Sequence, residues 1–296
     1  MNPSARADRG ALGALVAAAF LFGITFVVIK DAVRDVPPLS FVGWRFLVGA
    51  IALMVLAFPR TAAVWRDGAI GGMWLFAGFA FQTVGLTETD ATNSALITGL
   101  YVVFTPLLAA VWSRRMPSPW VVVGTVLGFI GLALLTITDG FALKSGDLLT
   151  LACAASFAAH IVFLSKSATR HPVIPFTAVQ LGVTAALGLV ASLLLEGPVI
   201  PARSQWAAIA LTGLGVSAGA FILQVWAQTR IGPGMTAMVL TLEPVFGVAA
   251  GAIVLAERLS IRGWIGALLI FGAIQLVLKK GADPVSLEAE ALSAGH

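Results

Sequence analysis

Charged residues are scarce in this sequence. Of its 296 residues, 11% are Asp, Glu, Lys or Arg and 59% are hydrophobic, whereas soluble globular proteins contain about 25% charged residues. Such a chain cannot cover a water-soluble globule with polar surface, so we expect a lipid bilayer to be its solvent. The formal net charge of +4 does not indicate nucleic-acid binding, because the basic residues lie in short connectors and form no patch.

Residues that support covalent and metal chemistry are also few. The single cysteine, Cys153, excludes an intrachain disulfide. The three histidines are His160, His171 and His296, and the sequence contains no HExxH, GxSxG or P-loop motif. These absences argue against a membrane-embedded enzyme and against ATP-driven pumping by this chain alone. We therefore expect no catalytic residue, no cofactor and no metal ion.

Long apolar runs are what the sequence has in abundance. Runs of about 17–25 residues, the length that crosses a bilayer as a helix, occur ten times. They lie at 11–29, 38–58, 68–86, 92–112, 119–137, 147–165, 173–195, 204–226, 232–254 and 261–278. The first run imitates a signal peptide but exceeds the usual apolar region of about 7–15 residues. We therefore expect it to be retained, and we predict an all-α membrane protein with ten transmembrane helices.

Lysine and arginine are distributed unevenly between the connectors. With the amino terminus inside, eleven of these residues fall on the cytoplasmic side and six on the outer side, while Arg45 lies inside a span. This bias is typical of the positive-inside rule. We therefore expect residues 1–10 and 279–296 to be cytoplasmic tails of a multi-pass protein in the cell inner membrane.

The two halves of the chain resemble each other. FLFGITFVVIK (20–30) is similar to ASFAAHIVFLS (155–165), and GLYVVFTPLLAAV (99–111) is similar to VLTLEPVFGVAAG (239–251). The aligned pairs include Phe22 with Phe157, Thr25 with His160, Arg45 with Gln180, and Pro106 with Pro244. Chance similarity among helices rich in Leu, Ala and Gly is the alternative. The pairs favour a duplication with units 11–138 and 145–278. Each unit has five spans, an odd number, so the two units are inserted in opposite directions. Such inverted repeats place a binding site centrally between the units.

One segment resembles a known family. TLEPVFGVAAGAIVLAERLSIRGWIGALLIFGA (241–273) is similar to the closing segment of EamA-type members of the drug/metabolite transporter superfamily, and Phe22-Gly23 and Arg45 fit the same pattern. The resemblance implies a ten-helix transporter whose central cavity is lined by spans 1, 3, 4, 6, 8 and 9. Members of the family move amino acids, other metabolites or drugs, many of them outward. The first half departs from the pattern, because WSRRMPS at the end of its fourth span has no counterpart of Glu257.

Glu243 and Pro244 are unusual residues for the middle of a span. Glu243 lies about 11 residues, roughly 17 Å, into span nine, where a charge costs roughly 2.5–3.5 kcal/mol. Pro244 frees a carbonyl near Leu240, which needs a partner other than lipid. Both residues are tolerable if this face of the helix borders a polar cavity. Glu243 is then either an acid that contacts substrate or carries a proton, or a structural acid bonded to a neighbouring helix.

Span four carries a polar stripe that supports such a cavity. Ser94, Thr98, Tyr101 and Thr105 follow at spacings of 4, 3 and 4 and so share one helix face. In the register anchored on the two prolines, Thr98 and Thr105 correspond to Thr236 and Glu243. If the gap between the halves falls earlier, Tyr101 corresponds to Glu243 instead, and either register gives spans four and nine equivalent inward faces. The alternative is ordinary packing, because Ser and Thr can bond to their own helix backbone.

Further polar and aromatic residues are candidates for the cavity wall. His160 is either a hydrogen-bonded packing residue or a proton carrier, and Gln82 and Gln224 either line the cavity or clamp helices together. Flat rings suit a small amphipathic solute. The predicted cavity residues are Phe22, Thr25, Phe79, Gln82, Ser94, Thr98, Tyr101, Thr105, Phe157, His160, Gln224, Thr236 and Glu243.

Arg45 and the two paired prolines are interpreted as structural or gating residues. Arg45 lies roughly 10 Å from the outer end of span two and is expected either to snorkel outward or to pair with Glu88 or Asp90. Pro106 and Pro244 occupy equivalent positions in the two halves. Glycine pairs at four-residue spacing also permit close approach of helices; they are Gly68/Gly72, Gly124/Gly128, Gly215/Gly219 and Gly247/Gly251.

The predicted function is secondary transport by alternating access. We expect export of small amphipathic metabolites, with aromatic or other neutral amino acids as the first candidates. Efflux of lipophilic cations or drugs by proton antiport is the alternative, and a membrane-embedded enzyme or a scaffold is a reading from a different class. The expected partners are a small-molecule substrate, the lipid bilayer and a proton as candidate coupling ion. The sequence leaves the oligomeric state open, and a monomer is compatible with it.

Overall fold

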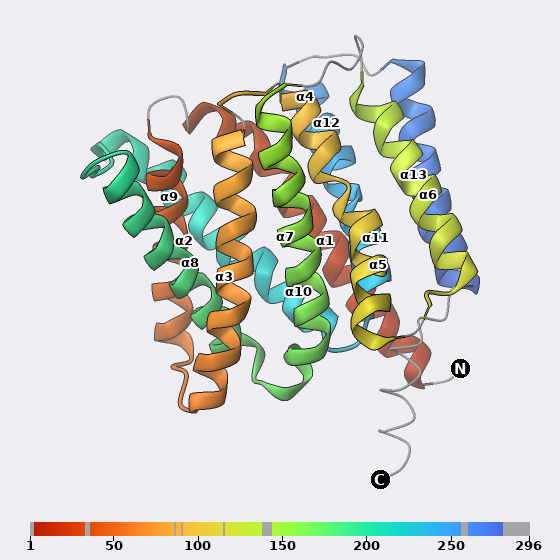
Figure 1. Ribbon diagram of the computed structural model, residues 1–296, viewed down its shortest axis with the longest axis horizontal. Helices are drawn as coiled ribbons and strands as arrows, with labels where there is room; N and C mark the ends of the chain where they lie inside the picture. Colours follow the sequence, from red (N-terminus) through yellow and green to blue (C-terminus); the bar gives the residue numbers. More distant parts are fainter. Residues whose placement is uncertain are drawn as a thin grey trace.

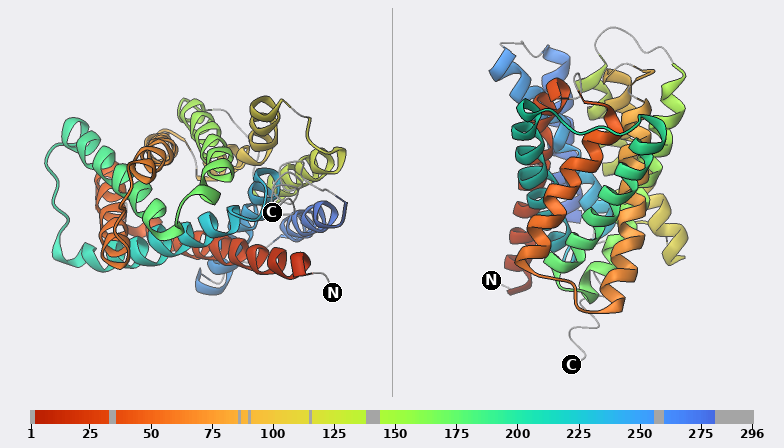
Figure 2. Two further views of the ribbon diagram at one scale, coloured as in Figure 1. Left: turned by 90° about the horizontal axis from the view of Figure 1, so that it is seen from below. Right: turned by 90° about the vertical axis from the view of Figure 1, so that its left-hand side faces the viewer.

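The computed structural model describes residues 3–32, 36–85, 87–89, 91–114, 116–137, 144–255 and 260–280. The regular elements in these ranges are helices that run side by side as a bundle (Figures 1 and 2). They are α1 (Pro3–Ala32), α2 (Pro38–Leu56), α3 (Ala62–Gly85), α4 (Ala91–Thr98), α5 (Tyr101–Ser113), α6 (Pro119–Thr136), α7 (Gly146–Ser167), η1 (Ala168–Arg170), α8 (Val173–Leu195), η2 (Arg203–Gln205), α9 (Trp206–Leu211), η3 (Thr212–Ala220), α10 (Phe221–Gln228), α11 (Pro233–Leu240), α12 (Leu242–Leu255) and α13 (Ile261–Lys280).

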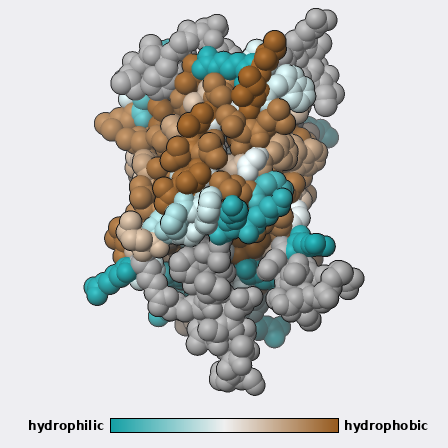
Figure 3. Space-filling model, turned by 90° about the vertical axis from the view of Figure 1, so that its right-hand side faces the viewer, coloured by the Kyte–Doolittle hydropathy of each residue, from teal (hydrophilic) through white to brown (hydrophobic). Residues whose placement is uncertain are grey.

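The helices overlap the predicted apolar runs, but α1 begins eight residues before the run at 11–29, inside the predicted tail, and α3 begins six residues before the run at 68–86. The run at 173–195 has the same bounds as α8, and the run at 119–137 is one residue longer than α6. Within the described residues, six helical stretches are long and apolar enough to cross a membrane, and Arg9–Ile24 and Pro119–Leu135 are shorter apolar helices. The face that carries α6 and α13 shows hydrophobic side chains across its middle and hydrophilic ones nearer its ends (Figure 3). The protein is therefore all-helical with the apolar surface of a membrane protein.

Two predicted spans are broken near their middle. Between α4 and α5, Leu100 N donates to Ile97 O (3.0 Å) and Val102 N to Gly99 O (3.1 Å), which are the tighter bonds of a 3-10 turn. Between α11 and α12, Thr241 N donates to Met238 O (3.2 Å) in the same manner. A third span contains the π-helix η3, which lies between α9 and α10.

The break at Thr241 changes the expected role of Pro244. A continuous span would have left a carbonyl near Leu240 without its donor. In the structure α11 ends at Leu240, so Pro244 falls in the first turn of α12. The first backbone N–H groups of a helix have no intrahelical acceptor, and a missing donor there removes no hydrogen bond. Pro106, by contrast, lies inside α5, where it does remove one.

Glycines allow close helix crossings, but some of the predicted glycine positions do not lie at one. A Cβ on Gly72 would lie 2.7 Å from Gln180 O, and one on Gly131 would lie 2.7 Å from Gly266 O. These two positions join α3 to α8 and α6 to α13. Gly128 and Gly215 have no neighbouring atom within 4 Å of such a Cβ, so the expectation of close approach at these two positions is wrong. Helix α6 meets α13 at Gly131 and also at the predicted Gly124, where a Cβ would clash with Val277 Cγ2.

Charged side chains connect neighbouring helices at the two ends of α8. Glu196, which follows α8, accepts hydrogen bonds from the backbone N–H groups of Leu39 (2.8 Å) and Ser40 (2.9 Å) at the start of α2. A carboxylate at this position satisfies free donors and complements the helix dipole. At the start of α3, Asp67 Oδ2 lies 2.8 Å from His171 Nε2 and Asp67 Oδ1 accepts from Arg66 Nε at 2.9 Å. These contacts hold α2 and α3 against opposite ends of α8.

Candidate substrate-binding site

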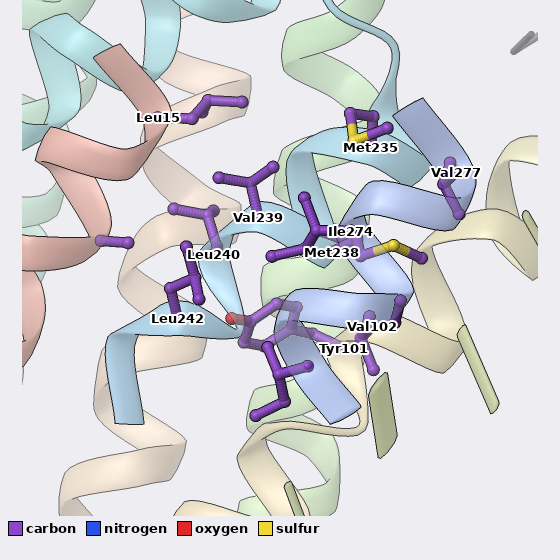
Figure 4. Close-up of a cluster of buried hydrophobic side chains, with 14 of the residues drawn as sticks. Leu15, Tyr101, Val102, Met235, Met238, Val239, Leu240, Leu242, Ile274 and Val277 are labelled. Carbon is purple, nitrogen blue, oxygen red and sulfur yellow. The ribbon is translucent and has the colours of Figure 1, made fainter. Parts of the chain in front are cut away.

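Glu243 lies within electrostatic range of side chains on three other helices. It is the second residue of α12 and is partly buried. Its carboxylate interacts electrostatically with Arg45 on α2, Tyr101 on α5 and Cys153 on α7. The Tyr101 hydroxyl points toward the segment that joins α11 to α12 (Figure 4). Glu243 therefore faces the interior of the bundle, and the helix break next to it brings a polar turn and an acid to the same level.

The Phe22-Gly23 pair packs directly against this acid's helix. A Cβ on Gly23 would lie 2.5 Å from Glu243 O, 2.8 Å from Phe246 Cβ and 2.9 Å from Gly247 N. Any larger residue at Gly23 would push α1 away from α12. The two segments on which the family resemblance was based, Phe22-Gly23 and the LEPVFG stretch, are therefore in contact. The glycine sets how closely α1 approaches Glu243.

Arg45 is buried among aromatic rings. Its side chain is 3% exposed, and its guanidinium carbon lies 4.8 Å from the ring centroids of both Phe46 and Phe79 and 5.8 Å from that of Phe41. The expectation that Arg45 snorkels outward is therefore wrong. Its electrostatic partner is Glu243 rather than Glu88, and Asp90 lies outside the described residues.

The rings near Arg45 form a continuous cluster that we call the phenylalanine cluster. Its members come from five helices and are Phe22, Phe46, Phe79, Phe157 and Phe221. Phe79 is central, with ring centroids 5.0 Å from Phe46, 5.2 Å from Phe157 and 6.4 Å from Phe221. Phe221 also lies 5.2 Å from Phe22. The rings are mostly edge-to-face, the arrangement that aromatic quadrupoles favour.

His160 is placed by an amide. Its Nε2 lies 2.9 Å from Gln180 Oε1, and its ring centroid lies 6.2 Å from that of Phe221. The side chain is 2% exposed. His160 thus borders the phenylalanine cluster while its polar atom is directed at α8, which favours the interpretation as a hydrogen-bonded packing residue.

Part of the polar stripe of span four also reaches neighbouring helices. Thr98 Oγ1 accepts from Gln82 Nε2 at 3.4 Å and lies 3.9 Å from Cys153 Sγ. Ser94 and Tyr101 are buried, with 3% and 7% exposure. Helices α3, α4, α5 and α7 therefore contribute polar groups around the same region as Glu243.

Three other predicted residues make hydrogen bonds within their own helices. Thr105 Oγ1 donates to Tyr101 O at 2.6 Å, and Thr236 Oγ1 donates to Gly232 O at 3.0 Å. Gln224 Nε2 donates to Gln228 Oε1 at 3.2 Å, and Gln228 Nε2 in turn donates to Ile161 O at 2.8 Å. The glutamines clamp α10 to α7, and the threonines follow the alternative of ordinary packing. The Thr25 side chain lies outside the described residues.

Several residues of this region have only weak signals in the sequence. Phe46 and Phe221 were not distinguishable from other apolar residues, because nothing in a single sequence says which rings of different helices meet. Gln180 was detectable only as the repeat partner of Arg45. Among the described residues, no three His, Cys, Asp or Glu side chains are grouped so that they could hold a metal ion.

Comparison with known proteins identifies the family. The model of the EamA-like transporter family matches residues 9–137 and 144–279. The chain belongs to the EamA-like transporter family. This confirms the resemblance drawn from the LEPVFG segment, and it makes the protein a transport protein of membranes built from transmembrane helices.

Individual EamA-like relatives cover most of the chain. An "Uncharacterized transporter" of Archaeoglobus fulgidus is 31% identical over 269 residues, which are 89% of this chain and 84% of that protein. A "Probable amino-acid metabolite efflux pump" of Salmonella typhimurium is 30% identical over 279 residues, covering 86% of this chain and 90% of that protein. A protein of the same name from Escherichia coli is 26% identical over 276 residues, covering 86% of this chain and 90% of that protein.

The fold is also found in a solved structure. That structure, titled "Crystal structure of protein", matches with a TM-score of 0.79 at 22% sequence identity, over 90% of this chain and 98% of the other. This EamA-like chain therefore has a fold already observed by experiment.

Proposed function

We propose that this EamA-like protein is a secondary transporter that exports small amphipathic metabolites by alternating access, with aromatic or other neutral amino acids as its first substrates. The observation that carries the choice is the phenylalanine cluster beside Arg45 and Glu243. Apolar rings with a few convergent polar groups suit a small molecule that has one polar end and one apolar end. The names of the Salmonella and Escherichia relatives support amino-acid metabolites as cargo.

The proposed architecture is ten spans in two inverted five-helix units, residues 11–138 and 145–278. The packing supports it. Helix α3 packs on α7, and its counterparts η3 and α10 pack on α1; likewise α4 and α5 pack on α7, and α11 and α12 pack on α1. The pairs α2–α8 and α6–α13 join equivalent helices of the two units. Exchange of the units therefore maps these contacts onto themselves, as expected for transporters that rock one unit against the other.

The proposed orientation has both termini in the cytoplasm and the protein in the cell inner membrane. The start of α1 and the end of α13 lie at the same end of the bundle (Figure 1), which agrees with an even number of crossings. The excess of Lys and Arg in the connectors at this end supports the cytoplasm as its side. Reporter fusions at the two termini test the orientation, because a periplasmic signal from either one would contradict it.

The transport proposal is tested with purified protein in liposomes. Radiolabelled uptake of a panel of amino acids and of lipophilic cations is measured with and without a pH gradient, against protein-free liposomes. We expect saturable uptake of aromatic or other neutral amino acids that exceeds that of the cations. Equal rates in both kinds of liposome for every amino acid would overturn the proposed substrate class.

Efflux of lipophilic cations or drugs by proton antiport is the second candidate, and the interior acid Glu243 favours it. An acid inside a membrane protein can attract a cation and exchange it for a proton. The same assay separates the two candidates, because cation uptake driven by a pH gradient supports the second. We propose that the chain is not an enzyme, and that a monomer suffices for transport.

A further inference from the structure

Arg45 is a buried cation in the bundle interior. It lies seven residues after the start of α2 at Pro38, which is roughly 10 Å along the helix. Its side chain is 3% exposed, and its Nε is buried without a hydrogen-bond acceptor among the described residues. Its guanidinium lies over the faces of Phe46 and Phe79. Rings attract a cation through their quadrupole, but they accept none of its directed N–H bonds in the way that an anion does.

A guanidinium in this situation lacks the partner that its chemistry demands. Buried charges in proteins are normally paired and hydrogen-bonded, since desolvation of an isolated charge is costly. The planar fork of arginine matches the two oxygens of a carboxylate. Glu243 interacts with Arg45 electrostatically, but no salt bridge joins these two described residues. The structure thus presents a positive group and a negative group on different helices that face the same interior without closing on each other.

We propose that Arg45 and Glu243 together recognise the zwitterionic head group of an α-amino acid. Arg45 binds the carboxylate, Glu243 binds the ammonium group, and the amino-acid side chain packs on the phenylalanine cluster. This inference rests on the proposed function and deepens it, because it assigns the two ends of the substrate to named residues. It also changes the interpretation of Arg45 from a structural or gating residue to a substrate-binding residue.

The chemistry of this pair separates zwitterions from related molecules. A lipophilic cation satisfies Glu243 and leaves Arg45 without an anion, while a simple carboxylic acid does the reverse. A site that hydrogen-bonds a substrate group rejects the analogue that lacks it, because the buried partner is left unpaired. A substrate with a charged side chain is disfavoured beside the uncharged rings, because that charge would be buried without a hydrogen-bonded partner.

The first experiment uses the wild-type protein. Inhibition of radiolabelled L-phenylalanine uptake into proteoliposomes is measured with three competitors: unlabelled L-phenylalanine, L-phenylalaninamide, which lacks the carboxylate, and 3-phenylpropionate, which lacks the ammonium group. We expect each analogue to compete at least about tenfold more weakly than L-phenylalanine. Equal competition by either analogue overturns the assignment of the corresponding end.

The second experiment assigns the ends to the residues. In Arg45→Gln, L-phenylalanine loses its advantage over L-phenylalaninamide; in Glu243→Gln, it loses its advantage over 3-phenylpropionate. Two exposed residues of the same types provide matched controls, Arg230→Gln and Glu88→Gln, and these keep both preferences. A merely structural role lowers affinity for all three molecules in parallel, and such a result overturns the proposal.

Binding to protein in detergent gives a readout independent of flux. A ligand that binds the folded state raises the unfolding temperature, so the same three molecules are compared on the wild type and the variants. If Arg45→Gln does not fold, the wild-type ranking of the three molecules and the charge-preserving variant Arg45→Lys still test whether Arg45 binds the carboxylate. A wild type that neither binds nor moves any amino acid defeats the proposed function itself, whereas a wild type that moves L-phenylalanine without the expected ranking defeats only this inference.

Discussion

The His160 imidazole on α7 and the Gln180 amide on α8 are joined by a hydrogen bond of 2.9 Å between Nε2 and Oε1. Gln180 Nε2 also donates to Phe176 O at 3.3 Å, so the amide is fixed at both ends. The two side chains are 2% and 1% exposed. In the proposed duplication Gln180 corresponds to Arg45, so the second unit carries a neutral, bonded amide where the first carries a cation whose Nε has no hydrogen-bond acceptor among the described residues.

We expect Gln180→Leu to destabilise the protein by about 1–3 kcal/mol, because it leaves the buried His160 nitrogen without a partner. The unfolding temperature of purified protein in detergent measures this loss. Gln275→Leu is the matched control, because Gln275 is exposed on α13. If both variants unfold at the wild-type temperature, the buried bond does not contribute to stability.

The crossing of α1 and α12 gives a prediction at the site itself. In Gly23→Ala the new methyl group would meet Glu243 O and Gly247 N, so α1 and α12 must separate at a cost of roughly 1–3 kcal/mol. We expect a lower unfolding temperature together with reduced transport. Gly13→Ala on the same helix has open space and gains helix propensity of up to about 1 kcal/mol. Wild-type stability and flux in Gly23→Ala would contradict the close crossing.

The ends of several helices could be predicted from the sequence, because apolar residues give way there to charge or proline. Helix α8 begins after Pro172 and ends before Glu196, and both limits are visible in the sequence. The breaks at residues 99–100 and at Thr241 were not predicted. The hydropathy pattern continues through both breaks, so it does not mark where the tighter turns form.

Individual residues of the site could be predicted from the sequence, but their arrangement in space could not. Glu243 was recognisable because an acid is expensive in an apolar run wherever its neighbours lie. Its relationship to Arg45 was not, since the two residues are far apart in the chain and no spacing rule connects them. The sequence allowed Thr105 and Thr236 either to line a cavity or to bond to the backbone of their own helix. The hydrogen bonds to Tyr101 O and Gly232 O favour the second interpretation.

Asp67 gives a pH dependence of stability outside the membrane-spanning segments. Its hydrogen bonds from Arg66 and from His171 hold the pKa of its carboxyl below the usual value of 3.8. A depressed folded-state pKa means that this stabilisation is fully present above the unfolded-state pKa and is lost as the pH falls through the folded-state value. We expect Asp67→Asn to unfold at a lower temperature than wild type at neutral pH, by about 1 kcal/mol for a partly screened pair. The difference should vanish in acid below the folded-state pKa, and a gap that persists there would contradict this account.

Glu243→Gln tests whether the interior acid carries a proton during transport. The substitution keeps the shape of the side chain but removes its charge and its ability to exchange a proton, so we expect the flux in proteoliposomes to fall by about tenfold or more. If Glu243 exchanges protons, the wild-type rate depends on pH and the residual rate of the variant does not. Glu88→Gln, at an exposed position, is the control that should follow the wild type at every pH. A variant that transports at wild-type rates across the pH range would exclude proton exchange at Glu243 and leave it the role of a structural acid beside the break at Thr241.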